Sequence, residues 1–398
     1  MTNTDLDGKW GIFVGSKNIP VERWDSFRTK FVQEMNIGHN SHICPGRSKR
    51  PVEWITNKEY SNIFSGLDND AFCRIVTGKE PAIVITEDEK VVDEPYSINF
   101  GLKNYQYCIA ITFINLYAST GRRILTSADR SDGGQPLSLG IPLVHTLTKH
   151  YSCIEEVPAN QLTMFLKNTA LSQVLSETAI KRKYGSEAPV QILHFYNIGS
   201  SAGATIPHLH AQSWIYLKKG RGWKDHGFIE AFENHKSLSN DSYYCLGCAY
   251  ARDVEKDALG QELNIRERRI YKNEHWQVVT EFAPERDGHL RILPLRHFSR
   301  INDATEPEYF SLADALIVAN RALSLFASEY GNKSFNIQKD RNILFRQQNG
   351  CHSSGFHLIV DIIPVQSTGG AELYDDHRIS HVFPEETAKK MRELLRDA

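Results

Sequence analysis

The alternation of apolar and polar residues predicts short strands in the first half of the chain. Strands are expected over residues 10–14, 82–85 and 190–196, with a strand-rich stretch over 96–118. Apolar residues recur at helical spacing over 161–184, and cationic residues gather toward the end of that segment, which predicts a helix. Together these elements predict an α+β fold.

The second half of the chain repeats this order of elements. Further strands are expected over 269–270, 276–282, 290–294 and 356–363, and helices over 306–330 and 385–397. We therefore expect an amino-terminal unit over residues 1–217, a polar connector over 218–240 and a carboxy-terminal unit over 241–398. Residues 332–342 are polar without clear periodicity and are expected to form a surface loop. A length of 398 residues also favours two units, because single cores rarely grow beyond about 250–300 residues.

Composition and charge exclude several classes of protein. A net charge of −2 provides no long-range attraction to nucleic acid or to anionic membranes. No run of 18 apolar residues occurs and residues 1–8 are polar, so we expect a soluble, cytoplasmic protein without a signal peptide. The seven cysteines, an odd number with only one close pair, do not resemble a disulfide framework.

The most specific motif is the segment FYNIGSSAGATIPHLHAQ at residues 195–212. If a strand follows the loop, His208, His210 and Gln212 point to one side of it. The small-residue loop before them has backbone N–H groups that could line an anion-binding concavity. Two imidazoles and an amide beside such a loop favour phosphate chemistry. The alternative is two histidines with ordinary hydrogen bonds on a half-buried strand.

An imidazole can attack a phosphorus centre and form a covalent phosphoramidate, which divides one difficult transfer into two easier steps. The amide of Gln212 could donate a hydrogen bond to a phosphoryl oxygen as charge develops there.

The segment resembles the active-site segment of the galactose-1-phosphate uridylyltransferase family, a branch of the histidine triad superfamily. The residues that match the family pattern are Asn197, Gly199, Gly203, Thr205, Pro207, His208, His210 and Gln212. The resemblance implies two histidine-triad-like units, each an antiparallel sheet with packed helices, one catalytic and one supporting. It implies that His210 is the nucleophile and that His208 is a metal ligand. It also implies that the phosphates are held by Asn197, Gly199, Ser200, Ser201, Gly203 and Thr205.

Other segments extend the resemblance over most of the chain after about residue 40. Residues 72–81, FCRIVTGKEP, are similar to the family's segment after its first metal site, although the family's Asn is missing there. Arg74 and Lys79 in this segment are candidates for phosphate contacts, with a solvated charged face as the alternative. Residues 369–395 look most like the ADP-glucose phosphorylase branch. Gly370 and Glu372 match positions near the sugar, where a tail from one subunit can complete the other's site, so a homodimer is expected.

Cys245 and Cys248 form a CxxC motif, which lets two thiolates bind one tetrahedral metal ion. The resemblance to the ADP-glucose phosphorylase branch implies His297 and His357 as the other two ligands of a zinc site, while His275 and His352 are alternatives. Two unpaired structural thiols are the other interpretation. Uridylyltransferases carry an H-x-H pair in the last strand where this chain has Ile359 and Asp361, so their iron-type site is not expected.

A second metal site is implied in the amino-terminal unit. Residues 39–47, HNSHICPGR, resemble the family's CxxC segment with only Cys44 retained. The implied ligands are Cys44, His150 and His208, together with His39 or His42. The alternative is a site that has lost its metal and is stabilised by packing.

The implied reaction is a double displacement by a nucleotidyltransferase. His210 attacks the α-phosphorus of a nucleotide sugar or related anhydride, and a sugar 1-phosphate leaves. Inorganic phosphate or another sugar 1-phosphate then accepts the nucleoside monophosphate. The alternatives are a dinucleoside polyphosphate phosphorylase or hydrolase, and a catalytically silent nucleotide-binding protein. The motifs do not distinguish between adenine, uracil and guanine.

Overall fold

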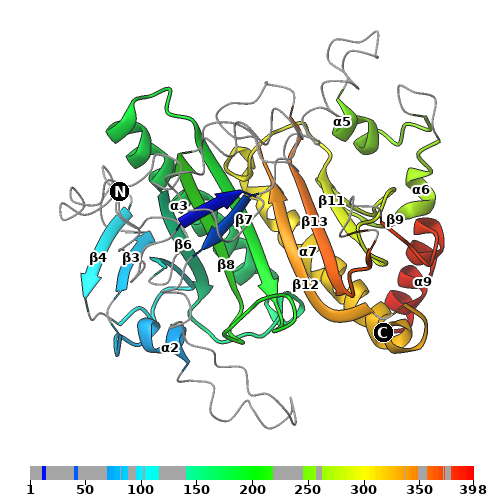
Figure 1. Cartoon of the computed structure of the whole chain (residues 1–398), viewed down its shortest axis with the longest axis horizontal. Helices are drawn as coiled ribbons and strands as arrows, with labels where there is room; N and C mark the ends of the chain where they lie inside the picture. The colour runs from blue at the N-terminus through cyan, green and yellow to red at the C-terminus, as the bar shows by residue number, and fades with distance from the viewer. Residues whose placement is uncertain are drawn as a thin grey trace.

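The structure is a computed structural model (Figure 1). It describes residues 11–14, 40–43, 70–80, 82–87, 96–101, 104–115, 140–217, 245–256, 262–335, 337–347, 356–370, 372 and 378–398. Two short strands, β1 (Gly11–Val14) and β2 (Asn40–Ile43), pair with each other. All the other described strands belong to a single sheet.

This sheet has eleven strands in the order β4-β3-β5-β6-β8-β7-β12-β13-β11-β10-β9, and neighbouring strands are antiparallel. The strands of the first half are β3 (Ala82–Glu87), β4 (Tyr96–Gly101), β5 (Ala110–Ile114), β6 (Gly140–Leu147), β7 (Val190–Ile198) and β8 (His210–Leu217). Those of the second half are β9 (Arg269–Lys272), β10 (Trp276–Thr280), β11 (Leu290–Pro294), β12 (Ile337–Arg346) and β13 (Ile359–Gln366).

The two halves meet where β7 pairs with β12, so that one sheet runs through the whole protein (Figure 1). Directly opposed residues form a continuous row across this junction. The row consists of Val144, Gln212, Phe195, Leu344, Asp361 and Arg291. Because opposed side chains point to the same face of a sheet, Gln212 and Asp361 lie on one face, in equivalent strands of the two halves.

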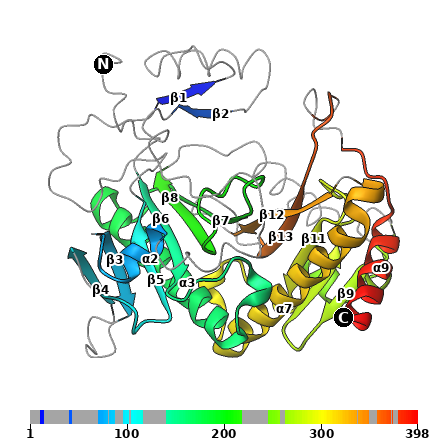
Figure 2. The same ribbon diagram turned by 90° about the horizontal axis from the view of Figure 1, so that it is seen from below.

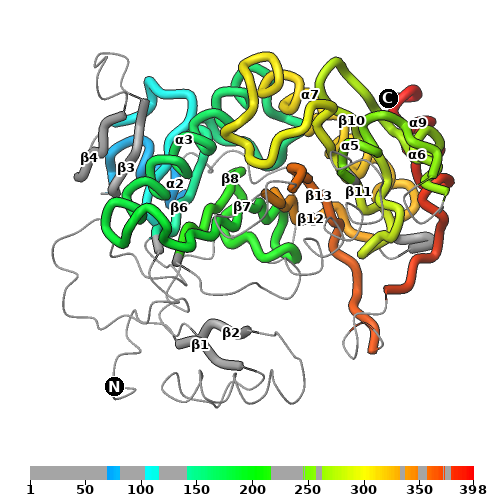
Figure 3. The backbone as a smooth tube through the Cα atoms, turned by 90° about the horizontal axis from the view of Figure 1, so that it is seen from above, coloured from blue at the N-terminus to red at the C-terminus, as the bar shows by residue number. Residues whose placement is uncertain are grey.

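The two long helices, α3 (Ala159–Tyr184) and α7 (Glu306–Phe326), lie on the same side of the sheet and contact each other (Figures 2 and 3). α9 (Pro384–Asp397) packs beside α7 and against β9 and β10. The remaining short helical elements are α2 (Ala71–Val76), α5 (Leu246–Ala251), α6 (Ile265–Arg268), η5 (Ile154–Glu156), η6 (Ile301–Asp303) and the π-helix η7 (Ala327–Phe335).

Helix α7 begins with a capping box, in which Thr305 and Glu308 satisfy each other's backbone N–H groups. Leu312, Leu316 and Leu323 are fully buried on its inner face. Among the described residues, Glu306–Gly331 is the one helical stretch long and apolar enough to cross a membrane, and 56% of its most apolar window is buried inside the protein. This burial is typical of a core helix.

The predicted α+β fold is confirmed, and the predicted helices and strands largely recur in the structure. α3 begins two residues before the predicted helix, and β11 has the predicted bounds. The predicted surface loop over 332–342 is wrong, because β12 begins at Ile337. Three polar residues of this strand, Asp340, Arg341 and Asn342, pair with other elements, and Arg341 is buried against Glu155 of η5. The predicted connector lies outside the described residues, so the division into units stays a prediction.

Candidate active site and metal centres

His210 and Gln212 lie on β8, and their side chains point to the same face of the sheet. The strand begins at His210, so His208 lies in the preceding loop and the strand alternation does not extend to it. The rings of both histidines nevertheless pack against Phe72 of α2, with centroid distances of 5.9 Å for His208 and 4.9 Å for His210. The start of β8 is therefore held against α2 by both imidazoles.

One hydrogen bond determines the tautomer of His210. Its Nδ1 lies 2.8 Å from the backbone carbonyl oxygen of His208. A carbonyl only accepts, so Nδ1 carries the proton and Nε2 carries the lone pair. Nε2 has no hydrogen-bond partner among the described residues. Burial lowers the pKa of His210 to about 4, so the ring is neutral at neutral pH.

The glycine loop that leads to β8 is closed by its own hydrogen bonds. Gly199 and Gly203 have positive φ angles of 91° and 94°, which favour glycine. The backbone N–H groups of residues 202, 203 and 204 donate to carbonyl groups within the loop. The Ser201 N–H donates to the Asp340 carboxylate at 2.8 Å. These four N–H groups therefore do not line the expected anion-binding concavity, because they already have partners, and the role of the loop in binding phosphate stays a prediction.

Asp340 and its strand neighbour Asn342 reach this loop from β12 and had not been identified from the sequence. A Cβ atom on Gly199 would lie 2.1 Å from the Asp340 carboxyl group, so only glycine fits there. The Asn342 amide donates to Asn197 at 2.9 Å and to the Ala202 carbonyl at 3.0 Å. The carboxy-terminal half thus shapes the predicted substrate loop of the amino-terminal half.

A buried polar network supports β8 from the face that α3 covers. His145 of β6 bonds Thr112 at 2.7 Å and Ser213 of β8 at 2.8 Å. Gln173 of α3 donates to the same Ser213 hydroxyl at 3.0 Å. Burial lowers the pKa of His145 well below its usual range, so the ring is neutral. Such satisfied buried networks hold a strand rigidly in place.

The structure brings Cys245, Cys248, His297 and His357 together, with one possible ligand atom from each lying within 4.8 Å of the others. Nδ1 of His297 lies 3.3 Å and 3.4 Å from the two sulfur atoms. Nδ1 of His357 donates to the Leu358 carbonyl at 3.0 Å, which leaves its buried Nε2 with a lone pair and no partner. These donors fit a tetrahedral zinc ion.

His275 and His352 were the alternative ligands for this group. His275 is absent from the group among the described residues, and His352 lies outside them. Gly247, between the two cysteines, has no room for a side chain, because a Cβ atom would lie 2.4 Å from the His357 ring. Hydrogen bonds from Cys245 and His297 hold the pKa of the Cys248 thiol below its usual value, which favours the thiolate that a metal needs.

A second group contains Asp70, Cys73, His150 and His208. The two histidines were predicted as ligands, whereas Asp70 and Cys73 were not. The prediction for Cys44 lies outside the described residues. Residues 72–81 were expected to follow the metal site, but Cys73 is one of the donors. The D-x-x-C spacing of the first two donors is the signal that could have identified them.

The hydrogen bonds of His208 favour a cation in this second group. Its Nε2 donates to the Leu147 carbonyl at 2.9 Å, so a neutral ring presents a lone pair at Nδ1. That Nδ1 faces the Asp70 carboxylate at 3.2 Å and the Cys73 sulfur at 3.6 Å. Two acceptors at such a distance need a proton or a metal ion between them. Burial opposes ionisation of Asp70, but hydrogen bonds with His150 and His208 outweigh it and lower its pKa.

The two groups are built in the same way. Asp70 caps α2 and accepts from the Cys73 N–H, and Cys245 caps α5 and accepts from the Cys248 N–H. His150 follows β6 as His297 follows β11, and His208 precedes β8 as His357 precedes β13. The repeat expected from the order of elements therefore extends to the candidate ligands.

Four predicted contact residues have other partners or no neighbour. Arg74 pairs with Glu80 at 3.2 Å, and Lys79 is exposed. Glu372 pairs with Arg286 at 2.8 Å in the carboxy-terminal half, and Gly370 faces open space. Their roles at the substrate stay predictions.

No protein-family model matches the chain. Solved structures do match it. A uridylyltransferase structure is similar with a TM-score of 0.57 and 20% identity, covering 73% of this chain and 86% of its own. The chain has the uridylyltransferase fold. An X-ray structure of a GalT-like protein from Arabidopsis thaliana is similar with a TM-score of 0.58 and 18% identity, covering 81% of this chain and 92% of its own. The structure of an ADP-glucose phosphorylase from the same organism, with bound ADP-glucose, has a TM-score of 0.58 and 17% identity, covering 89% of this chain and 95% of its own. The resemblance identified from the sequence is confirmed at the level of the fold.

Proposed function

We infer that this protein is a nucleotidyltransferase that uses His210 as a covalent nucleophile. The observation that carries this proposal is the hydrogen bond from His210 Nδ1 to the His208 carbonyl. It fixes the ring orientation and leaves Nε2 with a lone pair and no partner among the described residues. A positioned, neutral imidazole is the form that can attack phosphorus.

In the first step, Nε2 of His210 forms a bond to the α-phosphorus of a nucleotide sugar. The bond from that phosphorus to the oxygen of the leaving sugar 1-phosphate breaks. In the second step, an oxygen of phosphate or of another sugar 1-phosphate attacks the same phosphorus, and the nitrogen–phosphorus bond breaks. The amide of Gln212, on the same face of β8, donates a hydrogen bond to a phosphoryl oxygen.

Nucleotide sugars are the first donors to test, because two of the similar structures are a uridylyltransferase and an ADP-glucose phosphorylase with bound ADP-glucose. Because the sequence identity of both proteins to this chain is low, their structures support a shared fold and do not by themselves assign a substrate. The choice between uridine and adenosine donors therefore belongs to the experiment.

The proposal includes a structural metal in each half. Cys245, Cys248, His297 and His357 would hold one zinc ion, and Asp70, Cys73, His150 and His208 would hold a second cation. A bound metal crosslinks segments that are distant in the sequence. In the second group it would also fix the loop whose His208 carbonyl orients the nucleophile.

The test is intact-protein mass spectrometry after brief incubation with UDP-glucose, ADP-glucose or GDP-mannose. We expect a mass gain of one nucleoside monophosphate in the wild-type protein and none in His210→Asn, whose amide can keep the hydrogen bond to the His208 carbonyl. His275→Asn is the matched control, since His275 lies in neither metal group nor on β8, and it retains the adduct. An adduct that persists in His210→Asn would contradict the proposed nucleophile.

A further inference from the structure

Asn342 connects the carboxy-terminal half to the predicted substrate loop. It lies on β12, directly opposite Asn197 of β7. Its Nδ2 lies 3.0 Å from the Ala202 carbonyl oxygen and 2.9 Å from the Asn197 amide. Both of its N–H bonds are thus directed at the loop and at the strand that leads into it.

These two contacts determine which way both amides point. The Ala202 carbonyl can only accept, so the Asn342 atom beside it is the amide nitrogen. The Asn197 atom beside that same nitrogen must then be its oxygen, Oδ1. Asn197 is therefore held with Nδ2 on the opposite side, facing Gly203. A Cβ atom built on Gly203 would lie 3.6 Å from this nitrogen.

The register of β7 and β8 places Asn197 next to the proposed nucleophile. Phe195 is opposite Gln212 and Tyr196 is opposite Ala211, so the next step along the two strands brings Asn197 opposite His210. Residues opposed in this way have Cβ atoms about 4.5–5.5 Å apart on one face of the sheet. Among the described residues, Nδ2 of Asn197 has no hydrogen-bond acceptor. Both amide protons of Asn197 are thus without an acceptor on the face of the sheet that carries His210.

Asp340 strengthens this arrangement by removing the alternative donors. Its carboxylate accepts from the Ser201 N–H at 2.8 Å, while the N–H groups of residues 202–204 are bonded within the loop. The N–H groups of residues 201–204 are therefore not available to a phosphate beside His210, whereas the side-chain amides of Asn197 and Gln212 have a donor group without an acceptor among the described residues.

We propose that Asn342 is a positioning residue for nucleotidyl transfer, which orients Asn197 so that its Nδ2 donates to a phosphoryl oxygen of the group transferred to His210. This role rests on the proposed function. It makes β12, in the non-catalytic half, part of the catalytic apparatus. The β7–β12 pairing is what places Asn342 directly opposite Asn197.

The experiment measures the single-turnover rate of nucleotidyl-His210 formation at saturating UDP-glucose or ADP-glucose, whichever labels the wild-type protein. Asn342→Asp keeps the shape but presents an acceptor to Asn197 Oδ1 and to the Ala202 carbonyl. Asn342→Ala removes the contact and serves if the aspartate variant does not fold. We expect each to be about 10- to 100-fold slower, as for loss of one oriented donor. Gln338→Ala, at an exposed position on the same strand, is the matched control and keeps the wild-type rate.

A double variant separates positioning from a structural effect. If Asn342 acts through Asn197, then Asn197→Ala/Asn342→Ala is no slower than Asn197→Ala alone. Multiplied losses in the double variant, or a wild-type rate in Asn342→Ala, would overturn the positioning role while leaving the proposed function in place. A wild-type protein that forms no adduct with any donor would overturn both.

Discussion

β8 of the amino-terminal half and β13 of the carboxy-terminal half hold equivalent places in the sheet, and each follows a histidine of a candidate metal group. His208 is followed by His210 and Gln212 on β8, and His357 is followed at the same spacing by Ile359 and Asp361 on β13. The metal-group histidine is common to both halves. The proposed nucleophile and the glutamine amide occur in one half only.

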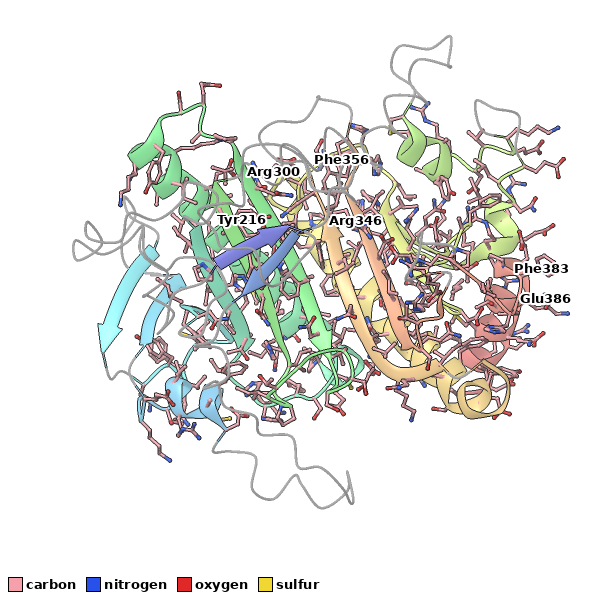
Figure 4. All side chains as sticks on the ribbon, in the orientation of Figure 1. Tyr216, Arg300, Arg346, Phe356, Phe383 and Glu386 are labelled. Atoms are coloured by element: carbon pink, nitrogen blue, oxygen red, sulfur yellow. The ribbon has the colours of Figure 1, made fainter. Side chains whose placement is uncertain are left out.

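Gln212 and Asp361 hold equivalent positions in the two strands, but their surroundings differ. The Gln212 side chain is half-buried and has no hydrogen-bond partner among the described residues. Asp361 is fully buried and binds Arg291 at 2.8 Å and Arg346 at 2.6 Å. Figure 4 labels Arg346 at the end of β12. The carboxy-terminal half pairs the polar group at this position, whereas the amino-terminal half leaves it without a partner among the described residues.

The largest expected effect comes from moving the proposed nucleophile between the halves. His210→Asn/Ile359→His places an imidazole at the equivalent strand position of the other half. We expect nucleotidyl transfer to fall by about 10³-fold or more, as for loss of a nucleophile, because Asp361 and its arginines leave no free amide donor there. Initial rates of sugar 1-phosphate release measure this. Recovered activity would mean that strand position alone determines catalysis.

Removing one donor from either metal group should lower the zinc content by one equivalent. Cys248→Ser breaks the carboxy-terminal group and Asp70→Ala breaks the amino-terminal group, since each loses one of four ligands. Elemental analysis of the purified variants, beside the unfolding temperature, measures both effects. Unchanged zinc in Asp70→Ala, with His275→Asn as the control, would show that the Asp70 group is held by hydrogen bonds alone.

Asp361→Asn should destabilise the fold by about 3–5 kcal/mol, because the fully buried carboxylate that two half-buried arginines share is lost. Gln212→Ala, at the equivalent position of the catalytic half, should cost less than about 1 kcal/mol. Urea unfolding followed by circular dichroism gives both values. Similar losses in the two variants would remove the distinction between a structural and a functional position.

The stabilisation by Asp361 should depend on pH in a predictable direction. Burial opposes its ionisation, but Arg291 and Arg346 outweigh this effect and hold the pKa of Asp361 well below its usual range. Its contribution is therefore complete above the unfolded-state pKa of about 3.9 and is lost as the pH falls below it toward the folded-state pKa. The difference in unfolding free energy between wild type and Asp361→Asn should narrow from pH 6 to pH 3. A constant difference would contradict this assignment.

The smallest effect is expected at the exposed contact between α3 and α7. Lys167 and Glu306 form an ion pair at 2.7 Å, but the glutamate side chain is 68% exposed. Lys167→Ala should change the unfolding free energy by less than about 1 kcal/mol, because solvent screens such pairs. A larger loss in urea unfolding would mean that the two halves depend on this contact.

Local patterns in the sequence were sufficient for the elements that bury one apolar face. α3, α7, α9 and β11 were predicted because periodic apolar residues produce their burial directly. The resemblance to a family supplied His210 and Gln212 as candidate catalytic residues and the four residues of the carboxy-terminal candidate metal group. His210 and Gln212 lie in one short motif. The metal group combines the short CxxC motif with two histidines that the family resemblance supplied.

Tertiary structure alone decided the residues whose partners are distant in the chain. Asp340 and Asn342 lie in a polar segment with no periodicity, and their role arises only where β12 pairs with β7. Asp70 became a candidate ligand because folding places α2 beside His150 and His208. Sequence determines a strand or helix through its own burial pattern, whereas the polar contacts of this site depend on which strands become neighbours, and that is set by the packing of the whole sheet.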